Sequence, residues 1–389
     1  MKNSRQYIAK TLFGLEPILA TELEELGATN IQPLKRAVSF EGDKALLYKA
    51  NLHLRTALRV LVPIHHFNAT NEHQFYRGIQ SINWSKYMDK NDSLAINATV
   101  YSSYFNHSKY MTFKAKDAIV DQFRKHFHVR PSIDLDDPTL RINVHIAEDE
   151  CTVSLDSSGS SLHKRAYRTA THRAPINEVL AAGMILLSGW RGQRPFYDMM
   201  CGSGTIPCEA ALIGQNVAPG TYREHFGFYS WKDYDHTLWK DIKVAAKEQE
   251  KELEHPVVAA DIAIKTVEMA RGNMVKPAFE EIRVFRKDFF KYVPKYENGV
   301  LIMNPPYGER YFEEDINNFY KKIGDSMKQH YAGFEAWIIS SNIPAIKSVG
   351  LRTSKKLLLF NSQLECKYHK YDLYKGTKEI KKTSDSAEM

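Results

Sequence analysis

The stretch Val300-Leu-Ile-Met-Asn-Pro-Pro-Tyr-Gly-Glu-Arg310 decides how the second half of this chain folds. Its first four residues form an apolar run typical of a buried strand. Asn304 ends that run, and the two prolines after it allow neither a helix nor a continued strand. The chain must therefore turn sharply, with Asn304 and Tyr307 at the carboxyl end of a strand, where open α/β sheets bind ligands.

The chemistry of this turn suits a flat heterocycle that carries an exocyclic amine. Asn304 and the carbonyl of Pro305 can accept hydrogen bonds from such an amine, and Tyr307 can stack on the ring. The structural alternative is a proline-punctuated loop after a core strand. Asn304, Pro305 and Tyr307 are therefore the predicted catalytic residues.

A second motif earlier in the chain has the order strand, glycine loop, helix. Phe196–Met200 is the predicted strand, Cys201-Gly-Ser-Gly-Thr205 the tight loop, and Ile206–Ile213 the start of the helix. Gly202 and Gly204 let the backbone approach a ligand closely. This layout is that of a nucleotide-binding turn.

The ligand of this loop is not expected to be a pyrophosphate. Pro207 holds the last glycine position of a dinucleotide fingerprint, and no lysine follows as in a phosphate-binding loop. Asp198 precedes the loop and could meet an ammonium group, which fits S-adenosylmethionine. The cofactor-binding residues predicted here are Asp198, Cys201, Gly202, Ser203, Gly204 and Thr205.

Two further acids follow predicted strands. Asp261 ends Val257–Asp261 and suits ribose hydroxyls. Asp288 lies just past Ile282–Phe285, where it could accept from an adenine amine while Phe289 packs on the ring. A helix cap or a solvated loop would explain either acid singly. Their recurrence after successive strands favours a cofactor site, which Asn304 would complete.

The spacing between the glycine loop and Asp261 is much longer than in a simple dinucleotide fingerprint. Residues 219–255 are the obvious insertion, and they are rich in Tyr, Phe, Trp and His. The insertion could pack on the fold or meet substrate, and packing is the preferred interpretation.

The N-terminal half divides into two modules. Residues 1–67 have the element order β-α-β-β-α-β of a small ferredoxin-like unit. Residues 68–161 form a second α+β module, and Ser157-Ser-Gly-Ser-Ser161 marks a boundary. The remainder, 162–389, is the predicted catalytic domain.

Basic residues follow that boundary. A segment that tracks phosphates needs several cations with an aromatic residue among them. A solvated basic linker is an equal alternative for this segment. The predicted contacts with a phosphate backbone are Lys164, Arg165, Arg168 and Arg173, together with Lys114 on the helix Thr112–Phe127.

Composition bounds the class of protein. The chain has 389 residues, is 43% hydrophobic and carries a net charge of +7, which permits a polyanionic partner without requiring one. Cys151, Cys201, Cys208 and Cys366 are too scattered for a disulfide framework or a zinc site. With no long apolar run and no hydrophobic signal region, we expect a cytoplasmic protein without metal or membrane partner. A monomer is plausible, and the oligomeric state stays open.

Assembled, these motifs resemble the THUMP-domain RNA methyltransferases, and more narrowly the RlmL type, whose guanine 2-amino methyltransferase half acts on bacterial large-subunit ribosomal RNA. Ala166 departs from the glycine usual in that family. The fused two-enzyme form has a second methyltransferase domain, so a shorter relative could modify a different RNA position. The matching stretches are Phe13–Glu16, Val38–Gly42, Asn51–Arg55, Leu162–Arg168, Ala174–Ala182, Asp198–Ala211 and Asn304–Arg310.

The resemblance implies an α/β class I, Rossmann-like methyltransferase with a seven-stranded, mostly parallel sheet, preceded by ferredoxin-like and THUMP modules. S-adenosylmethionine would be the methyl donor and a guanine 2-amino group, most readily in 23S ribosomal RNA, the acceptor. Alternatives are a transfer-RNA guanine methyltransferase, an adenine amine methyltransferase of RNA or DNA, and a non-catalytic RNA-binding protein on this fold. A nicotinamide oxidoreductase fits worst, because the glycine loop is short and the acid distant.

Overall fold

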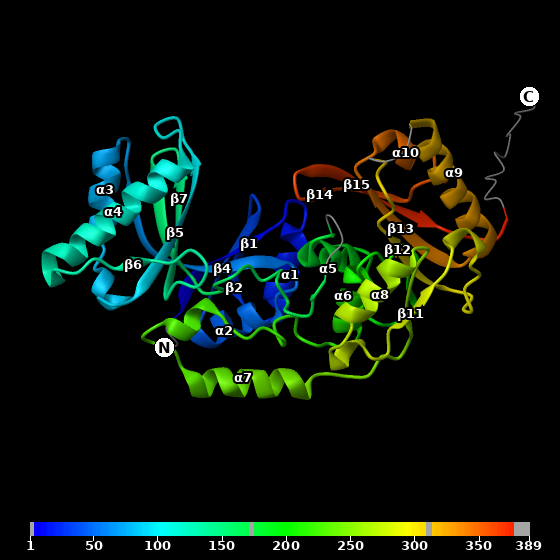
Figure 1. The fold of residues 1–389 in the computed structure, drawn as a ribbon, viewed down its shortest axis with the longest axis horizontal. Coiled ribbons are helices and arrows are strands. Elements are labelled where there is room, and N and C mark those ends of the chain that lie inside the picture. The colour runs from blue at the N-terminus through cyan, green and yellow to red at the C-terminus, as the bar shows by residue number, and fades with distance from the viewer. Residues whose placement is uncertain (1–3, 171–174, 309–312, 377–389) are drawn as a thin grey trace, which may run out of the picture.

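The computed structural model describes residues 4–170, 175–308 and 313–376. Two sheets organise the molecule, one built by the N-terminal half and one by the C-terminal half (Figure 1). No helix within these described ranges combines the length and the apolar character needed to cross a bilayer. The THUMP-like module lies at one end of the molecule, the catalytic domain at the other, and the ferredoxin-like module between them.

The N-terminal sheet has eight strands in the order β2-β3-β1-β4-β8-β7-β5-β6. It is continuous across both predicted modules because β4 is long enough to pair on both sides: with β1 near its start and with β8 from Leu61 onward. The strands are β1 Arg5–Thr11, β2 Thr29–Leu34, β3 Ala37–Gly42, β4 Ala57–Asn68, β5 Ser93–Tyr101, β6 Ser132–Ile133, β7 Leu140–Ala147 and β8 Glu150–Asp156.

The C-terminal sheet has seven strands in the order β11-β10-β9-β12-β13-β15-β14. Among these seven described strands, β15 alone runs in the opposite direction to the others, antiparallel to both β13 and β14. The predicted seven-stranded, mostly parallel sheet is confirmed. The strands are β9 Phe196–Asp198, β10 Val257–Asp261, β11 Arg283–Arg286, β12 Gly299–Met303, β13 Phe334–Ser340, β14 Lys355–Asn361 and β15 Leu364–Asp372.

Helices cover these sheets, and local capping explains several of their starts. The side chain of Asp43 accepts from the Leu46 amide at the start of α2, and that of Asn177 accepts from Val179 at the start of α5. The helices are α1 Glu16–Glu25, α2 Lys44–His53, α3 Glu72–Gln80, α4 Ser108–Phe127, α5 Glu178–Leu187, α6 Thr205–Gly214, α7 His236–Glu248, α8 Ile264–Asn273, α9 Glu313–His330 and α10 Ile343–Lys347.

The insertion between α6 and β10 packs on the ferredoxin-like module, as preferred from its composition. Its helix α7 lies alongside α2 (Figure 1). The ring of Phe228 stacks on that of Tyr48 at a centroid distance of 4.4 Å, and Trp239 meets Tyr48 edge-on. These rings belong to one apolar core, so the catalytic domain supplies part of the interior of the N-terminal module.

Arg223, at the start of this insertion, holds the segment between the two halves. Its guanidinium is buried and donates to the backbone carbonyls of Ser158, Ser160, Ser161 and Lys164. A planar fork with five N–H groups suits such a cluster of acceptors. The serine-rich stretch that marks the boundary in sequence is thus fixed in place by the domain that follows it.

Candidate functional site

Four polar residues follow four strands at one edge of the C-terminal sheet. Asp198 ends β9, Asp261 ends β10, Asp288 lies just after β11, and Asn304 lies just after β12. These strands are neighbours and run parallel, so their carboxyl ends meet at the same edge. The structure therefore brings the predicted cofactor and catalytic motifs together.

The glycine loop joins β9 to α6 in a conformation that needs glycine at two positions. Gly202 has φ 52° and Gly204 has φ 86°, both left-handed. A side chain on Gly202 would meet nothing within 4 Å, so this face of the loop is open. The Gly202 amide donates to a carboxylate oxygen of Asp261 over 3.1 Å, and the Cys201 amide donates to the Ala260 carbonyl. Loop and second acid are thus held together.

Asp198 is the residue whose surroundings most clearly indicate a ligand-binding site. It is fully buried, and its Oδ1 accepts from the Met200 amide over 3.2 Å. Its Oδ2 is buried without a hydrogen-bond partner among the described residues. Burial raises the pKa of this carboxyl well above its ordinary value, and the nearby Asp261 adds to the effect. A buried carboxylate oxygen beside an open glycine loop fits a ligand ammonium group.

The other two acids are engaged locally. Asp261 also accepts from the Ala263 amide, and Asp288 accepts from the Phe290 amide, as a helix cap would. Phe289 is 3% exposed and stacks on Tyr331 at 5.6 Å, inside the core. The expectation that the Phe289 ring packs on a ligand is not met in this structure, because its faces are used for packing.

Sequence reasoning missed Ile262, which offers the apolar surface that Phe289 does not. Its side chain is 62% exposed although it directly follows Asp261 at the edge of the sheet. An aliphatic residue there can cover one face of a flat ring whose attached ribose meets the acid. The signal was present in the sequence as an apolar residue immediately after the acid that ends a strand.

The Asn-Pro-Pro-Tyr turn is pre-ordered by side-chain contacts. The Tyr307 hydroxyl donates to Oδ1 of Asn304 over 2.8 Å, and the Asn342 amide donates to the Tyr307 carbonyl. The Pro306 carbonyl accepts from Tyr320, whereas no donor in the described part of the chain bonds to the Pro305 carbonyl. Burial raises the pKa of Tyr307, so its hydroxyl stays protonated. The Tyr307 ring packs partly against the core instead of standing free.

The predicted RNA contacts divide into exposed and internal residues. Lys164 is exposed, and Lys114 is partly exposed and lies 3.6 Å from Glu72. Arg165 is 2% exposed and bonds to the carbonyls of Leu162 and Arg55, so it cannot reach a polyanion in this structure. Its assignment as an RNA contact is wrong on the ground of burial.

Arg168 is also used internally. Its guanidinium donates to Thr205 Oγ1 over 2.7 Å and lies 3.1 Å from the Glu178 carboxylate. It therefore braces the first residue of α6 instead of facing solvent. Arg173 lies outside the described residues.

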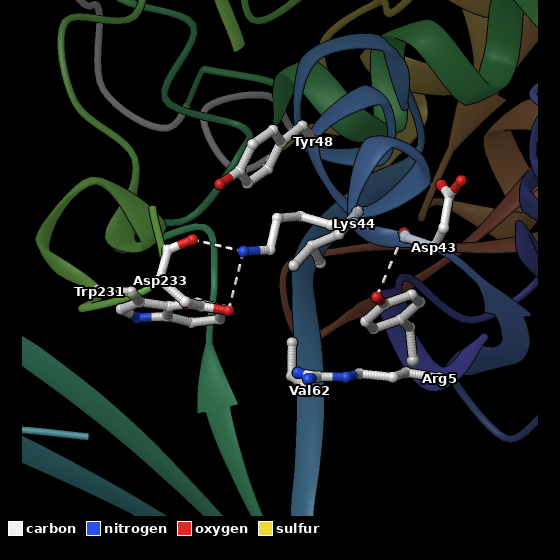
Figure 2. Close-up of a pocket in the computed structure, with 9 residues that line it drawn as sticks. Arg5, Asp43, Lys44, Tyr48, Val62, Trp231 and Asp233 are labelled. Carbon is white, nitrogen blue, oxygen red and sulfur yellow. Dashed lines mark hydrogen bonds and ion pairs between the residues drawn. The ribbon is translucent and has the colours of Figure 1, made fainter. Parts of the chain in front are cut away.

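A cavity of about 330 Å³ lies well away from this edge, between the ferredoxin-like module and the insertion (Figure 2). Lys44 reaches from α2 to Asp233 across it, with Trp231 on the insertion side. Charges of both signs line it, and none of the predicted site residues does. In the described ranges, no three His, Cys, Asp or Glu side chains are grouped to hold a metal ion.

Comparisons with known families divide the chain into three matched parts. Residues 165–370 match the family described as RMKL-like, methyltransferase domain. Residues 6–61 match the RlmL ferredoxin-like domain, and residues 69–156 match the THUMP domain.

Individual relatives agree with this division. A Synechocystis sp. protein named as a candidate RNA methyltransferase is 40% identical over 95% of this chain and 97% of its own length. The ribosomal RNA large subunit methyltransferase K/L of Methylococcus capsulatus is 35% identical over 96% of this chain, which spans only 52% of that enzyme. A candidate methyltransferase, SMU.472, solved with S-adenosylhomocysteine, is 28% identical with a TM-score of 0.85, covering 97% of this chain and all of that one.

Proposed function

The chain belongs to the RMKL-like methyltransferase family, with the RlmL ferredoxin-like and THUMP domains before its catalytic domain, and from this premise we propose its reaction. It transfers a methyl group from S-adenosylmethionine to the exocyclic 2-amino group of a guanine in RNA. Large-subunit ribosomal RNA is the proposed substrate, since a relative that carries this function in its name aligns over almost the whole chain.

One observation carries the proposal. The Oδ2 of Asp198, which has no hydrogen-bond partner among the described residues, and the Asn304 turn lie at the ends of β9 and β12, which are hydrogen-bonded neighbours in the sheet. A cation held at the first strand and a flat amine held at the second are thereby adjacent. This is the arrangement that transfer of a methyl group from a sulfonium to an aryl amine requires.

The residues present fit the methyl donor. Asp198 would bind the ammonium group of the methionine moiety. The loop from Cys201 to Thr205 would contact the rest of that moiety, and Asp261 would bind the ribose hydroxyls. Asp288 would accept from the adenine amine. When bound, S-adenosylmethionine supplies an electrophilic methyl group on a positively charged sulfur.

The turn activates an amine that is a weak nucleophile, because its lone pair is delocalised into the ring. Oδ1 of Asn304 and the carbonyl oxygen of Pro305 would accept hydrogen bonds from the two N–H groups of the amine and favour a more pyramidal nitrogen. The Tyr307 hydroxyl fixes the rotation of the Asn304 amide. Tyr307 could stack on the base only after its ring leaves its present packing. Since the amine proton becomes acidic after transfer, alignment matters more than a strong base.

The target base must leave its helix stack to reach this edge. An unpaired loop base costs least to extrude. The ferredoxin-like and THUMP modules would hold the surrounding RNA, with Lys164 and Lys114 as the proposed contacts that reach solvent.

The test removes the proposed acceptor and leaves the donor site intact. Asn304→Ala should bind S-adenosylhomocysteine in calorimetry like the wild type and lose about 10²–10³-fold in turnover, as expected when one positioned polar group is removed from a reacting centre. Near-normal turnover would contradict the catalytic assignment. A wild-type protein that fails to bind this ligand would favour the non-catalytic alternative.

The identity of the base requires a separate experiment. Nucleosides from RNA of a strain lacking this protein should lack a 2-methylguanosine, and fractionation would assign it to ribosomal or transfer RNA. Loss of a methyladenosine instead would replace guanine with adenine, because the Asn-Pro-Pro-Tyr chemistry accommodates either amine.

A further inference from the structure

Asn273, the last residue of α8, joins two segments that are far apart in the sequence. It is 1% exposed. Its Oδ1 accepts from the backbone amides of Thr169 and Ala170 over 2.8 and 2.9 Å. Its Nδ2 donates to the carbonyls of Ala170 and Ser203 over 2.8 and 3.0 Å. Ser203 is the middle residue of the glycine loop, and Thr169 and Ala170 belong to the segment that enters the catalytic domain.

These bonds are not those of a helix cap. None of the four goes to the backbone of α8, whose end is closed by the Met274 amide bonding to the Arg271 carbonyl. Both donors of the amide group and both lone pairs of its oxygen are used, and the Asn273 side chain is buried. Buried amides with every capacity satisfied hold their partners in one geometry, and removing them leaves several groups unpaired.

The glycine loop needs such a restraint. Two of its residues have left-handed backbone conformations, and its Gly202 side is open. The neighbouring contacts work in the same direction: Arg168 bonds to Thr205 Oγ1, and Gly204 packs so closely on α8 that a Cβ there would lie 3.2 Å from that of Ala270. The loop is thus held from outside at Ser203, Gly204 and Thr205.

We propose that Asn273 is a positioning residue for the methyl-donor loop, which keeps Ser203 docked against the segment 168–170. This inference rests on the proposed function of the loop. If the ligand-competent loop is only part of the population when Asn273 is absent, the apparent affinity falls by that fraction. The segment 168–170 also carries the chain from the RNA-binding modules, so its docking and donor binding are thermodynamically linked.

The experiment compares Asn273 with a matched buried asparagine. Asn51 is 2% exposed and bonds to Ser157 and Ser158, in the same connecting region but away from the glycine loop. Asn273→Asp keeps the acceptor for Thr169 and Ala170 and loses the donor to Ser203, while Asn273→Ala loses both. Asn51→Ala removes a comparable set of bonds at a distance. S-adenosylhomocysteine is titrated calorimetrically at low temperature, where the variants are folded, and each melting temperature is recorded.

We expect both Asn273 variants to bind this ligand about tenfold more weakly, the equivalent of about one lost net hydrogen bond. Asn51→Ala should melt earlier but bind with the wild-type dissociation constant. Asn273 variants that melt earlier yet bind within twofold of wild type would show a purely structural role and overturn the inference. Wild-type protein that binds no ligand would overturn the proposed function as well, so the two failures are distinguishable. Should Asn273→Ala not fold, Asn273→Asp alone decides.

Discussion

The phenolic oxygen of Tyr307 lies 2.8 Å from the amide oxygen of Asn304, and its hydroxyl proton points at the atom that is proposed to accept from the target base. One lone pair of the Asn304 oxygen is therefore occupied before substrate arrives, and the other remains. The tyrosine thus orients the amide without blocking it. The contribution of the Tyr307 hydroxyl to turnover can therefore be measured separately from that of its ring.

Tyr307→Phe should reduce turnover about fivefold, because the Asn304 amide can rotate once it loses a hydrogen bond worth about 1 kcal/mol. The affinity for S-adenosylhomocysteine should not change, since the hydroxyl faces Asn304 and not the glycine loop. Steady-state kinetics with saturating methyl donor provide the measurement. Unchanged turnover would mean that the hydroxyl only satisfies the partly buried Asn304 amide.

Asp198→Asn should weaken S-adenosylhomocysteine binding about ten- to hundredfold, the range for a charge-assisted hydrogen bond. Calorimetry measures this, with the exposed Asp136→Asn as the control that should bind normally. Binding to the wild type should release protons and strengthen as pH rises, because a ligand cation favours the ionised form of a carboxyl whose pKa burial has raised. Proton uptake on binding would contradict this role.

The same substitution should change how folding stability depends on pH. The folded pKa of Asp198 lies above its ordinary value of 3.8, so its contribution to stability is complete below that pH and is lost as pH rises toward the folded pKa. The free energy of unfolding of ligand-free Asp198→Asn should therefore increase relative to that of the wild type as the pH is raised from 5 to 8. Denaturant titrations at both pH values test this, and a gap that narrows with pH would refute it.

Alanine at the two loop glycines should produce different defects. At Gly202 the new Cβ meets open space, so the free energy of unfolding should fall by only about 1 kcal/mol, from backbone strain. The main effect of this substitution should be a lower affinity for the ligand. At Gly204 the Cβ would also lie 2.6 Å from Met274 Cε and 3.2 Å from Ala270 Cβ, so stability should fall by about 2 kcal/mol. Melting curves with and without S-adenosylhomocysteine separate the two effects. Equal loss of stability would show that the Gly202 side is not open.

Ala166→Gly should stabilise the protein. Ala166 has φ 64°, a left-handed conformation that costs an alanine about 1–2 kcal/mol, partly offset by the greater chain entropy of glycine when unfolded. A net gain of about 0.5–1 kcal/mol is expected in the free energy of unfolding, measured by denaturant titration. Ala245→Gly, at an exposed position inside α7, is the control and should lose stability, because glycine is unfavourable in a helix interior. A loss at both positions would show that the strain at Ala166 is already relieved.

The strands were predictable because apolar runs bounded by polar turns identify buried strands of a parallel sheet. Val257–Asp261 has the bounds expected from sequence, and β12 differs from its prediction only by Gly299. The short helix Glu72–Gln80 was not identified from the sequence, although its two buried residues, Phe75 and Ile79, have the i, i+4 spacing of one helix face. Pro175 is a favourable first-turn residue and predicts a helix that begins there, but α5 begins instead after its cap, Asn177.

The polar motifs of the site were predictable because they follow strands directly, and strand ends share an edge. Burial was not. Arg165 and Arg168 are basic residues in a run, and only the fold shows that they lie beside Glu209 and Glu178, carboxylates supplied by helices later in the chain. Phe289 and Ile262 illustrate the same limit, because sequence identifies an apolar residue near a site without telling which face it shows.

The stacking of Phe228 on Tyr48 has a consequence for how such proteins can exchange parts. A ferredoxin-like module transplanted between relatives along its sequence boundaries would lose the aromatic rings that complete its interior, because these rings belong to the catalytic domain of the protein from which it was taken. The recipient's Arg223 would likewise meet a foreign connecting segment. Interchangeable units in this family therefore do not coincide with contiguous stretches of chain, and a working hybrid has to inherit the insertion together with the module it fills.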